Sequence, residues 1–255
     1  MKDSPAQSAP QDGWATPLVS AGLWAAGLTW LALTLPPLTL LLRAVGPDRA
    51  EPLVQVYIRG QLALTLCRWR AVVDPSLDPN GRYLFVQNHV NLLDHVTMYP
   101  ATPHFKQGME LLSHFDIPFY GWFMRARGTI PVERDKKTAL LALRRAMKAE
   151  LAKGHSLLAF PEGTRTRDGH VAPFHEGLFH LARALEVPVV PVAVTGMWSV
   201  MPTGSWRFRP FQTVTVHVMA PIPTAGLSRD AVSALAQSVR AQIAERVDAS
   251  LREAA

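Results

Sequence analysis

The sequence is poor in cysteine, and its amino-terminal part is poor in charge. Cys67 is the only cysteine among 255 residues, which excludes an internal disulfide framework and a thiolate metal cluster. No Asp, Glu, Lys or Arg occurs between residues 13 and 42. Internal repeats and low-complexity segments are absent, which excludes a repeat architecture. The chain is 48% hydrophobic, enough for one sizeable domain with an appendage.

The uncharged amino-terminal stretch predicts a membrane anchor. Leu18 to Leu35 is an almost unbroken apolar run that ends at Pro36-Pro37. At about 1.5 Å per residue it extends roughly 27 Å, close to the thickness of a hydrocarbon core. A second apolar stretch, Leu53 to Trp69, predicts an amphipathic helix at the membrane interface or on the domain. We expect residues 1–70 to form membrane-anchoring helices hinged at the two prolines, either as a single span or as an interfacial insertion.

Charge predicts the orientation and the partners of such a protein. If the first stretch spans a membrane, five arginines between residues 43 and 70 outnumber Lys2, and the positive-inside rule places the domain in the cytoplasm. Residues 106–153 hold ten Lys and Arg against five Asp and Glu, which suits an anionic lipid surface or a phosphate-bearing substrate. Nucleic acid is not expected, because no nucleic-acid motif accompanies this charge. A cleaved signal peptide fits poorly, because the leader also carries Asp3 and Asp12.

Strand-like and helix-like stretches alternate after the turn-rich residues 74–81. Strands are predicted at 71–73, 83–86, 104–107, 128–132, 156–160, 189–194 and 213–218. Helices fall between most of them, including a basic one at 136–153, and a last amphipathic helix runs from Ser228 to Leu251. This alternation predicts an α/β domain over residues 71–255, with a mostly parallel sheet covered by helices.

A histidine and an aspartate follow the second predicted strand, in the stretch Asn88-His89-Val90-Asn91-Leu92-Leu93-Asp94. If His89 lies in the turn and Asp94 in the first helical turn, the carboxylate can fix the tautomer of the ring. The other ring nitrogen can then take a proton from a hydroxyl, so we predict that His89 is a catalytic base. The plain structural alternative, which the short spacing by itself favours, makes Asn91 an N-cap and His89 a turn residue.

Three more blocks follow in the same part of the chain, namely Gly128-Thr-Ile-Pro-Val-Glu-Arg134, Phe160-Pro-Glu-Gly-Thr-Arg165 and Val187-Pro-Val-Val-Pro-Val192. Together with His-x4-Asp they resemble the four blocks of the glycerolipid acyltransferases, and the Phe-Pro-Glu-Gly-Thr-Arg block is the most specific. The chain looks like a member of the 1-acylglycerol-3-phosphate O-acyltransferase family. This resemblance implies acyl transfer from acyl-CoA or acyl-carrier protein to the sn-2 hydroxyl of lysophosphatidic acid, a membrane lipid, to give phosphatidic acid. No metal or cofactor is implied.

The chemistry of acyl transfer gives the first of these blocks its expected role. His89 and Asp94 supply the base and the group that orients it. Main-chain N–H groups near the strand end or the helix start are expected to stabilise the oxyanion. Asn91 stands where the family often has a small hydroxyl residue, and it is expected to cap the helix instead. Lys106 lies in a stretch that only loosely resembles the family's lysine-containing stretch, so no substrate role is expected for it.

The other blocks are expected to bind the acceptor. Arg134 and Arg165 are predicted to bind its phosphate through charge-assisted hydrogen bonds. Gly163 permits close backbone approach and Thr164 offers a hydroxyl. Glu162 is predicted to order the arginines or to bind the glycerol hydroxyls.

Two other functions are compatible with the sequence. The same chemistry can act on glycerol 3-phosphate, another lysophospholipid or an acylated amino acid. A protein of another class, a catalytically silent membrane lipid-binding protein, is less consistent with the intact His89, Asp94, Glu162 and Arg165.

Overall fold

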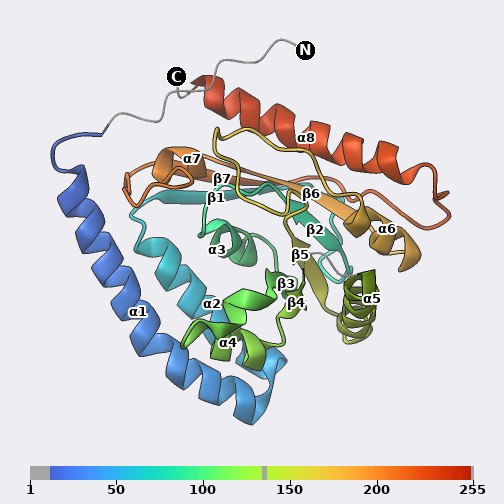
Figure 1. The fold of residues 1–255 in the computed structure, drawn as a ribbon, viewed down its shortest axis with the longest axis horizontal. Helices are drawn as coiled ribbons and strands as arrows, with labels where there is room; N and C mark the ends of the chain where they lie inside the picture. The colour runs from blue at the N-terminus through green and yellow to red at the C-terminus, as the bar shows by residue number, and fades with distance from the viewer. Residues whose placement is uncertain (1–11, 134–136, 254–255) are drawn as a thin grey trace.

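A seven-stranded sheet forms the centre of the molecule (Figure 1), in a computed structural model that describes residues 12–133 and 137–253. The strand order is β1-β7-β6-β2-β5-β3-β4, and every neighbouring pair is parallel except β6 and β7. The strands are β1 (Arg68–Val73), β2 (Leu84–Gln87), β3 (Lys106–Leu111), β4 (Ile130–Val132), β5 (Ser156–Ala159), β6 (Val189–Thr195) and β7 (Thr213–Val218).

Helices cover the sheet, which confirms the predicted α/β class. They are α1 (Thr16–Val45), α2 (Pro47–Ala63), α3 (Asp94–Met98), α4 (Tyr120–Arg127), α5 (Lys137–Ala152), α6 (Gly177–Ala184), α7 (Met197–Val200) and α8 (Val232–Glu253). Short 3-10 turns lie at Tyr99–Ala101 and Leu112–Asp116. Helix α8 packs on β6 at the top of Figure 1, whereas α1, α2 and α4 lie together at its lower left.

Strand β2 lies in the middle of the sheet, between β5 and β6, and all four of its residues are buried. A parallel strand that is buried on both faces is expected to be apolar throughout, as Leu84, Phe85 and Val86 are. The predicted strand at 104–107 lies two residues further on, because its residues 106–108 pair with β5 and its residues 109–111 pair with β4. Because β2 and β5 are parallel neighbours, their carboxyl ends meet at one edge of the sheet.

The predicted hinge at Pro36-Pro37 is wrong. Both prolines lie inside α1, which is continuous to Val45, and the chain turns at Gly46 with a φ of 84°. Proline has a helical φ, but inside a helix it removes one N–H donor and its ring clashes with the carbonyl four residues earlier. Packing on both sides of the pair offsets this cost and keeps the helix intact. Leu35, Leu38 and Leu42, which flank the prolines, are buried.

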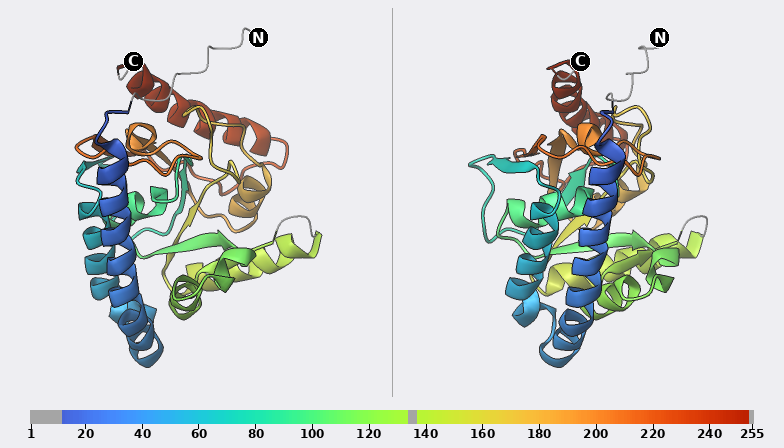
Figure 2. Two further views of the ribbon diagram at one scale, coloured as in Figure 1. Left: turned by 60° about the vertical axis from the view of Figure 1, so that its left-hand side comes forward. Right: turned by 90° about the vertical axis from the view of Figure 1, so that its left-hand side faces the viewer.

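Helix α1 packs against the rest of the molecule along its length (Figure 2). Near its start, the Ser20 hydroxyl accepts a hydrogen bond from the Phe208 N–H, at 2.8 Å. In its middle, Trp30 lies over α2 at Gly60, where a Cβ atom would come within 2.3 Å of the Trp30 ring. The buried leucines of α1 share one core with the sheet. The division of the chain at residue 70 stays a prediction, although the predicted helix at 53–69 ends at Ala63.

Two buried cations fix the segments next to the amino end of β3. The Lys106 ammonium is fully buried and donates to the carbonyls of Tyr99, Thr102 and His104, at 2.9 to 3.0 Å. It thereby ties down the chain that follows α3. Arg127 is paired with Glu51 of α2. The three carbonyl partners of Lys106 give it a structural position.

Candidate active site

The chain leaves β2 in a fixed direction because Asn88 continues its pairing with β6. The Asn88 side chain donates to the Val194 carbonyl at 3.1 Å and accepts from the Val194 N–H at 2.8 Å. His89 is therefore the first residue beyond the sheet's carboxyl edge, where open α/β folds build their sites. This is the location that the sequence predicts for it.

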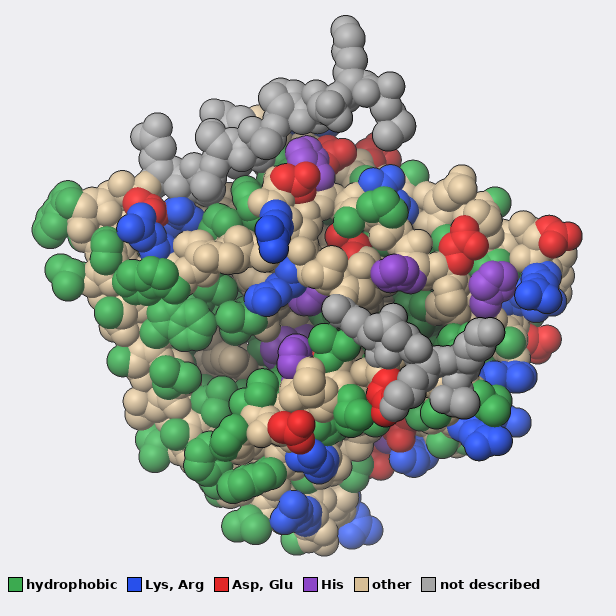
Figure 3. All heavy atoms as spheres, viewed as in Figure 1, with side chains coloured by type: hydrophobic (Ala, Val, Ile, Leu, Met, Phe, Trp, Pro, Cys, Tyr) green, Lys and Arg blue, Asp and Glu red, His purple; other side chains and the backbone are tan. Residues whose placement is uncertain are grey.

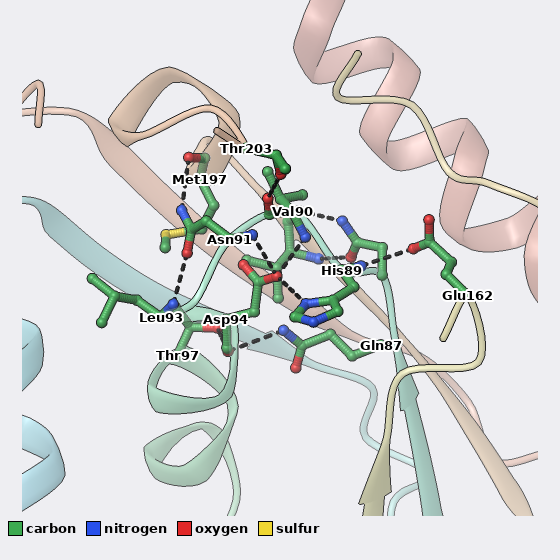
Figure 4. Close-up of polar contacts among 12 residues, drawn as sticks. Gln87, His89, Val90, Asn91, Leu93, Asp94, Thr97, Glu162, Met197 and Thr203 are labelled. Carbon is green, nitrogen blue, oxygen red and sulfur yellow. Dashed lines mark hydrogen bonds and ion pairs between the residues drawn. The ribbon is translucent and has the colours of Figure 1, made fainter. Parts of the chain in front are cut away.

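His89 and Asp94 meet across the corner between β2 and α3 (Figure 4). His89 Nδ1 lies 2.8 Å from Asp94 Oδ2, and their side chains are 23% and 1% exposed. A carboxylate acceptor at this distance places the ring proton on Nδ1 and the lone pair on Nε2. No described residue forms a hydrogen bond with Nε2, and the ring borders an open cleft. The predicted pair of a base and its orienting carboxylate is present.

Asp94 also organises the turn itself. Its Oδ2 atom accepts from the backbone N–H groups of Val90 and Asn91, the second at 2.9 Å. Three donors thus converge on one buried oxygen, which fixes the carboxylate against the turn. The expected oxyanion donors near the strand end are therefore wrong, because the N–H groups of residues 89–91 already donate to carboxylates.

Asn91 does not cap α3, contrary to expectation. Its side-chain oxygen accepts from the Leu93 N–H at 2.8 Å, which closes a local turn. Its amide nitrogen donates to the carbonyls of Met197 and Met201, at 3.2 and 3.3 Å. The side chain thus joins the turn that holds His89 to α7, so a small hydroxyl residue would not reach both partners.

The loop that follows β5 holds His89 from the other side. The Phe160 ring stacks on the imidazole, with 4.2 Å between the ring centroids and 25° between the planes. The Glu162 carboxylate accepts from the His89 N–H at 2.8 Å, and the Thr166 N–H donates to the His89 carbonyl at 2.9 Å. The roles of Phe160 and Thr166 could not be predicted from the sequence, because they depend on β2 and β5 being neighbours in the sheet.

Glu162 is directed into the wall of the cleft. Its second carboxylate oxygen accepts from the Ala172 N–H at 2.9 Å, and the residue is 3% exposed. Burial raises the pKa of the Glu162 carboxyl to about 7, while the hydrogen bonds from Ala172 and His89 act in the opposite direction. Both Glu162 oxygens thus accept from backbone N–H groups, while its predicted role toward glycerol hydroxyls or arginines stays a prediction.

A cleft of about 640 Å³ opens in front of His89. Gly163, Thr164 and Arg165 line it, as the sequence predicts for acceptor-binding residues. Gly163 has a φ of 66°, a conformation that favours glycine, and a Cβ atom there would lie 3.0 Å from His175. Arg134, the other predicted phosphate ligand, lies outside the described residues.

Two further polar groups border the cleft that the sequence did not single out. His114 Nδ1 lies 2.8 Å from Glu110 Oε1, and both side chains line the cleft wall. Their spacing of four residues is common on surfaces, so it carried no functional signal. Within the described ranges, no cluster of three or more His, Cys, Asp and Glu side chains is placed to bind a metal ion.

The known proteins that this chain resembles in sequence are acyltransferases. A sequence model of the acyltransferase family matches residues 70–195. The chain is 36% identical over 175 residues to a chloroplastic 1-acyl-sn-glycerol-3-phosphate acyltransferase of Arabidopsis thaliana, covering 68% of this chain and 47% of that protein. It is 33% identical over 167 residues to 1-acyl-sn-glycerol-3-phosphate acyltransferase alpha of Homo sapiens, covering 64% and 57%. The chain thus spans about half the length of these relatives.

The fold has a counterpart among solved structures. The crystal structure of the 1-acyl-sn-glycerophosphate (LPA) acyltransferase PlsC from Thermotoga maritima superposes with a TM-score of 0.75. The match covers 91% of this chain and 95% of that one, at 19% sequence identity. This similarity concerns the fold, including its amino-terminal part.

Proposed function

We propose that the chain transfers a fatty acyl group from a thioester to the sn-2 hydroxyl of 1-acylglycerol 3-phosphate, giving phosphatidic acid, because a sequence model of the acyltransferase family matches residues 70–195. The His89–Asp94 pair at the head of an open cleft is the observation that carries this proposal. The relatives' names give the acceptor. The donor is acyl-CoA or acyl-carrier protein, as the sequence resemblance implies.

The proposed reaction uses one base and no covalent enzyme intermediate. His89 Nε2 takes the proton of the acceptor hydroxyl as its oxygen attacks the thioester carbonyl. Asp94 stabilises the imidazolium that forms. The carbon–sulfur bond of the tetrahedral intermediate then breaks, and the thiolate leaves with the proton from His89. No metal takes part in this scheme.

The donors for the oxyanion are proposed to lie on the loop after β5. Thr164 and Arg165 border the cleft, and no described carbonyl accepts from their backbone N–H groups. The Thr164 hydroxyl is a third donor in the same place. Preorganised donors of this kind favour the charge that develops on the carbonyl oxygen.

A small recess of about 40 Å³ adjoins the cleft and is proposed to receive the first part of the acyl chain. Tyr57, Phe123 and Met124 line it, on α2 and α4. It shares Met109, Glu110 and Phe160 with the cleft, so the first part of an acyl chain can extend from the thioester carbon past Met109 and Phe160.

A thiol-release assay with acyl-CoA tests the proposed function. Release is expected with lysophosphatidic acid and not with glycerol 3-phosphate, another lysophospholipid or an acylated amino acid. A chelator is expected to leave the rate unchanged. Release with another acceptor would replace the proposed substrate, and the absence of release with every acceptor and either donor would favour a lipid-binding protein.

The Arg165→Ala variant is expected to use the phosphate-bearing acceptor less well. Losing a charge-assisted hydrogen bond costs about 1.5 to 3 kcal/mol, or about one to two decades in kcat/KM. We expect the ratio of kcat/KM for lysophosphatidic acid to kcat/KM for its dephosphorylated analogue to fall by the same factor. The same fall is expected for Arg134→Ala. Arg167→Ala is the matched control, because Arg167 is exposed and does not line the cleft. Undiminished preference in both variants would remove these arginines from the phosphate site.

Helix α1 is proposed to lie in the membrane interface rather than to span it. It is long and apolar enough to cross a membrane by length and composition. However, it packs on the domain near both ends, so a spanning orientation would draw the sheet into the hydrocarbon. Apolar side chains gather on this side of the molecule (Figure 3), and Leu33 and Leu40 are 70% and 66% exposed. A cytoplasmic location stays a proposal, since the positive-inside rule orients only helices that span.

The double variant Leu33→Asp/Leu40→Asp is expected to bind vesicles more weakly. Each buried leucine contributes about 1.5 to 3 kcal/mol, so losing both lowers vesicle partitioning by at least about two decades. Activity on a short-chain, water-soluble acceptor is expected to persist. The matched control is Leu141→Asp on α5, where the leucine is 52% exposed. If the double variant, the Leu141→Asp control and wild type all bind vesicles equally, membrane binding through α1 is contradicted.

Cysteine labelling distinguishes the two orientations of α1. In a Cys67→Ser background, we expect a membrane-impermeant thiol reagent outside the vesicles to label Trp14→Cys and Arg49→Cys equally. Trp14 lies just before α1 and Arg49 lies in the first turn of α2, just after α1, and both are exposed. Protection of the cysteine at position 14 alone would show that α1 spans the bilayer.

A further inference from the structure

The loop after β5 contacts the ring face, the backbone N–H and the backbone carbonyl of His89. Phe160 covers one face of the His89 ring, Glu162 accepts from its N–H, and Thr166 donates to its carbonyl. In Figure 4, the Glu162 side chain approaches the His89 backbone from the side opposite Asp94. The imidazole is thus oriented by Asp94, while its backbone position depends on this loop.

Of Phe160, Glu162 and Thr166, only Glu162 uses two side-chain atoms to connect the backbone of His89 with the backbone of Ala172. Oε1 accepts from the His89 N–H at 2.8 Å, and Oε2 accepts from the Ala172 N–H at 2.9 Å. With 3% of its surface exposed, the residue has little area to offer a substrate hydroxyl. Removing the carboxylate would leave two N–H groups without their acceptor in the wall of the cleft.

We propose that Glu162 is a positioning residue, which sets the backbone of His89 so that Nε2 is aimed at the acceptor hydroxyl, and that it does not bind the acceptor. This inference rests on the proposed acyl transfer. General-base catalysis depends on the distance and angle between the base and the proton, and a misplacement of about 1 Å can cost about a hundredfold in rate. Replacing Glu162 is therefore expected to lower kcat, whereas replacing a ligand of the acceptor would raise KM.

The charge state of Glu162 decides the conditions of the test. Only the carboxylate offers two acceptor oxygens, because a protonated carboxyl presents an O–H to one of the two N–H groups. Since burial raises the pKa of this carboxyl to about 7, assays are best run near pH 8, roughly one unit above it. His89 and Asp94 are the titratable groups that face it.

The experiment compares Glu162→Gln with wild type in the full chain, using lysophosphatidic acid at varied concentration. Glutamine has one acceptor oxygen, so it satisfies one N–H and opposes the other with its own NH2 group. We expect kcat to fall by about a hundredfold and KM for the acceptor to stay within about twofold. Glu176→Gln is the matched control, because Glu176 is exposed, borders neither the cleft nor His89, and is expected to keep both constants.

A second readout needs no substrate. The ring N–H proton that His89 shares with Asp94 is expected to give a downfield proton NMR signal, which His89→Ala identifies by its loss. We expect this signal to shift or broaden in Glu162→Gln and to remain in Glu176→Gln. If Glu162→Gln does not fold, Glu162→Asp takes its place, because the shorter side chain reaches only one of the two N–H groups.

Two outcomes would overturn the inference. A tenfold or larger rise in KM at unchanged kcat would make Glu162 a ligand of the acceptor. An unchanged NMR signal together with unchanged kinetics would show that the two hydrogen bonds do not position His89. If wild type and Glu176→Gln both fail to release thiol, the proposed function fails instead, and the NMR comparison still decides the role of Glu162.

Discussion

The His89→Ala protein is expected to lose about two to four decades in kcat, the usual contribution of a positioned general base. His89 is the group whose unbonded Nε2 borders the cleft, and alanine has no atom that could accept the proton. The fold is expected to persist, because the ring is partly exposed and its main packing contact is with Phe160. The measurement is steady-state thiol release, with circular dichroism to verify folding.

His180→Ala is the control for His89→Ala. His180 lies on α6 and does not border the cleft, so its loss is expected to leave kcat within about twofold of wild type, the scale of surface substitutions. A folded His89→Ala protein with wild-type turnover would end the mechanism proposed above.

The Asp94→Asn protein is expected to lose about two or more decades in kcat and to be less stable. Three N–H donors converge on Asp94 Oδ2, from the His89 ring, Val90 and Asn91. An uncharged amide accepts these bonds more weakly, and it stabilises the imidazolium less. The Oδ1 atom is buried without a hydrogen-bond partner in the described residues, so an NH2 group there would be unsatisfied.

The expected loss in stability of Asp94→Asn is about 1 to 3 kcal/mol, because a buried donor is left without an acceptor. Urea unfolding measures this loss, and thiol release measures kcat. Asp116→Asn is the matched control, since the Asp116 side chain is 84% exposed and pairs with Arg125 at 3.5 Å. If Asp94→Asn retained wild-type kcat, the carboxylate would not act on the imidazolium.

The sequence alone predicted the features that depend only on residues close together in the chain. His89 and Asp94 are five residues apart and separated by a strand-to-helix corner, so their contact needs only that corner to form. The apolar run before His89 identified a buried strand, because a parallel strand in the middle of a sheet is apolar on both faces. The alternation of strands and helices predicted the fold class, because each of these elements is recognised from its own local pattern of apolar residues.

The tertiary structure decided the features that depend on distant parts of the chain. Glu162 was recognised as a site residue, but its orientation follows from the placement of β5 beside β2, which brings residues 73 positions apart into hydrogen-bonding distance. The N–H groups of residues 89–91, near the strand end, were expected to stabilise the oxyanion, but carboxylates accept from them, and one of these carboxylates comes from that loop. Pro36-Pro37 predicted a break that packing of the flanking leucines overrides. Local sequence thus specified which groups are present, and long-range strand pairing and core packing determined where each group points, because a side chain's direction is set by the backbone on which it stands.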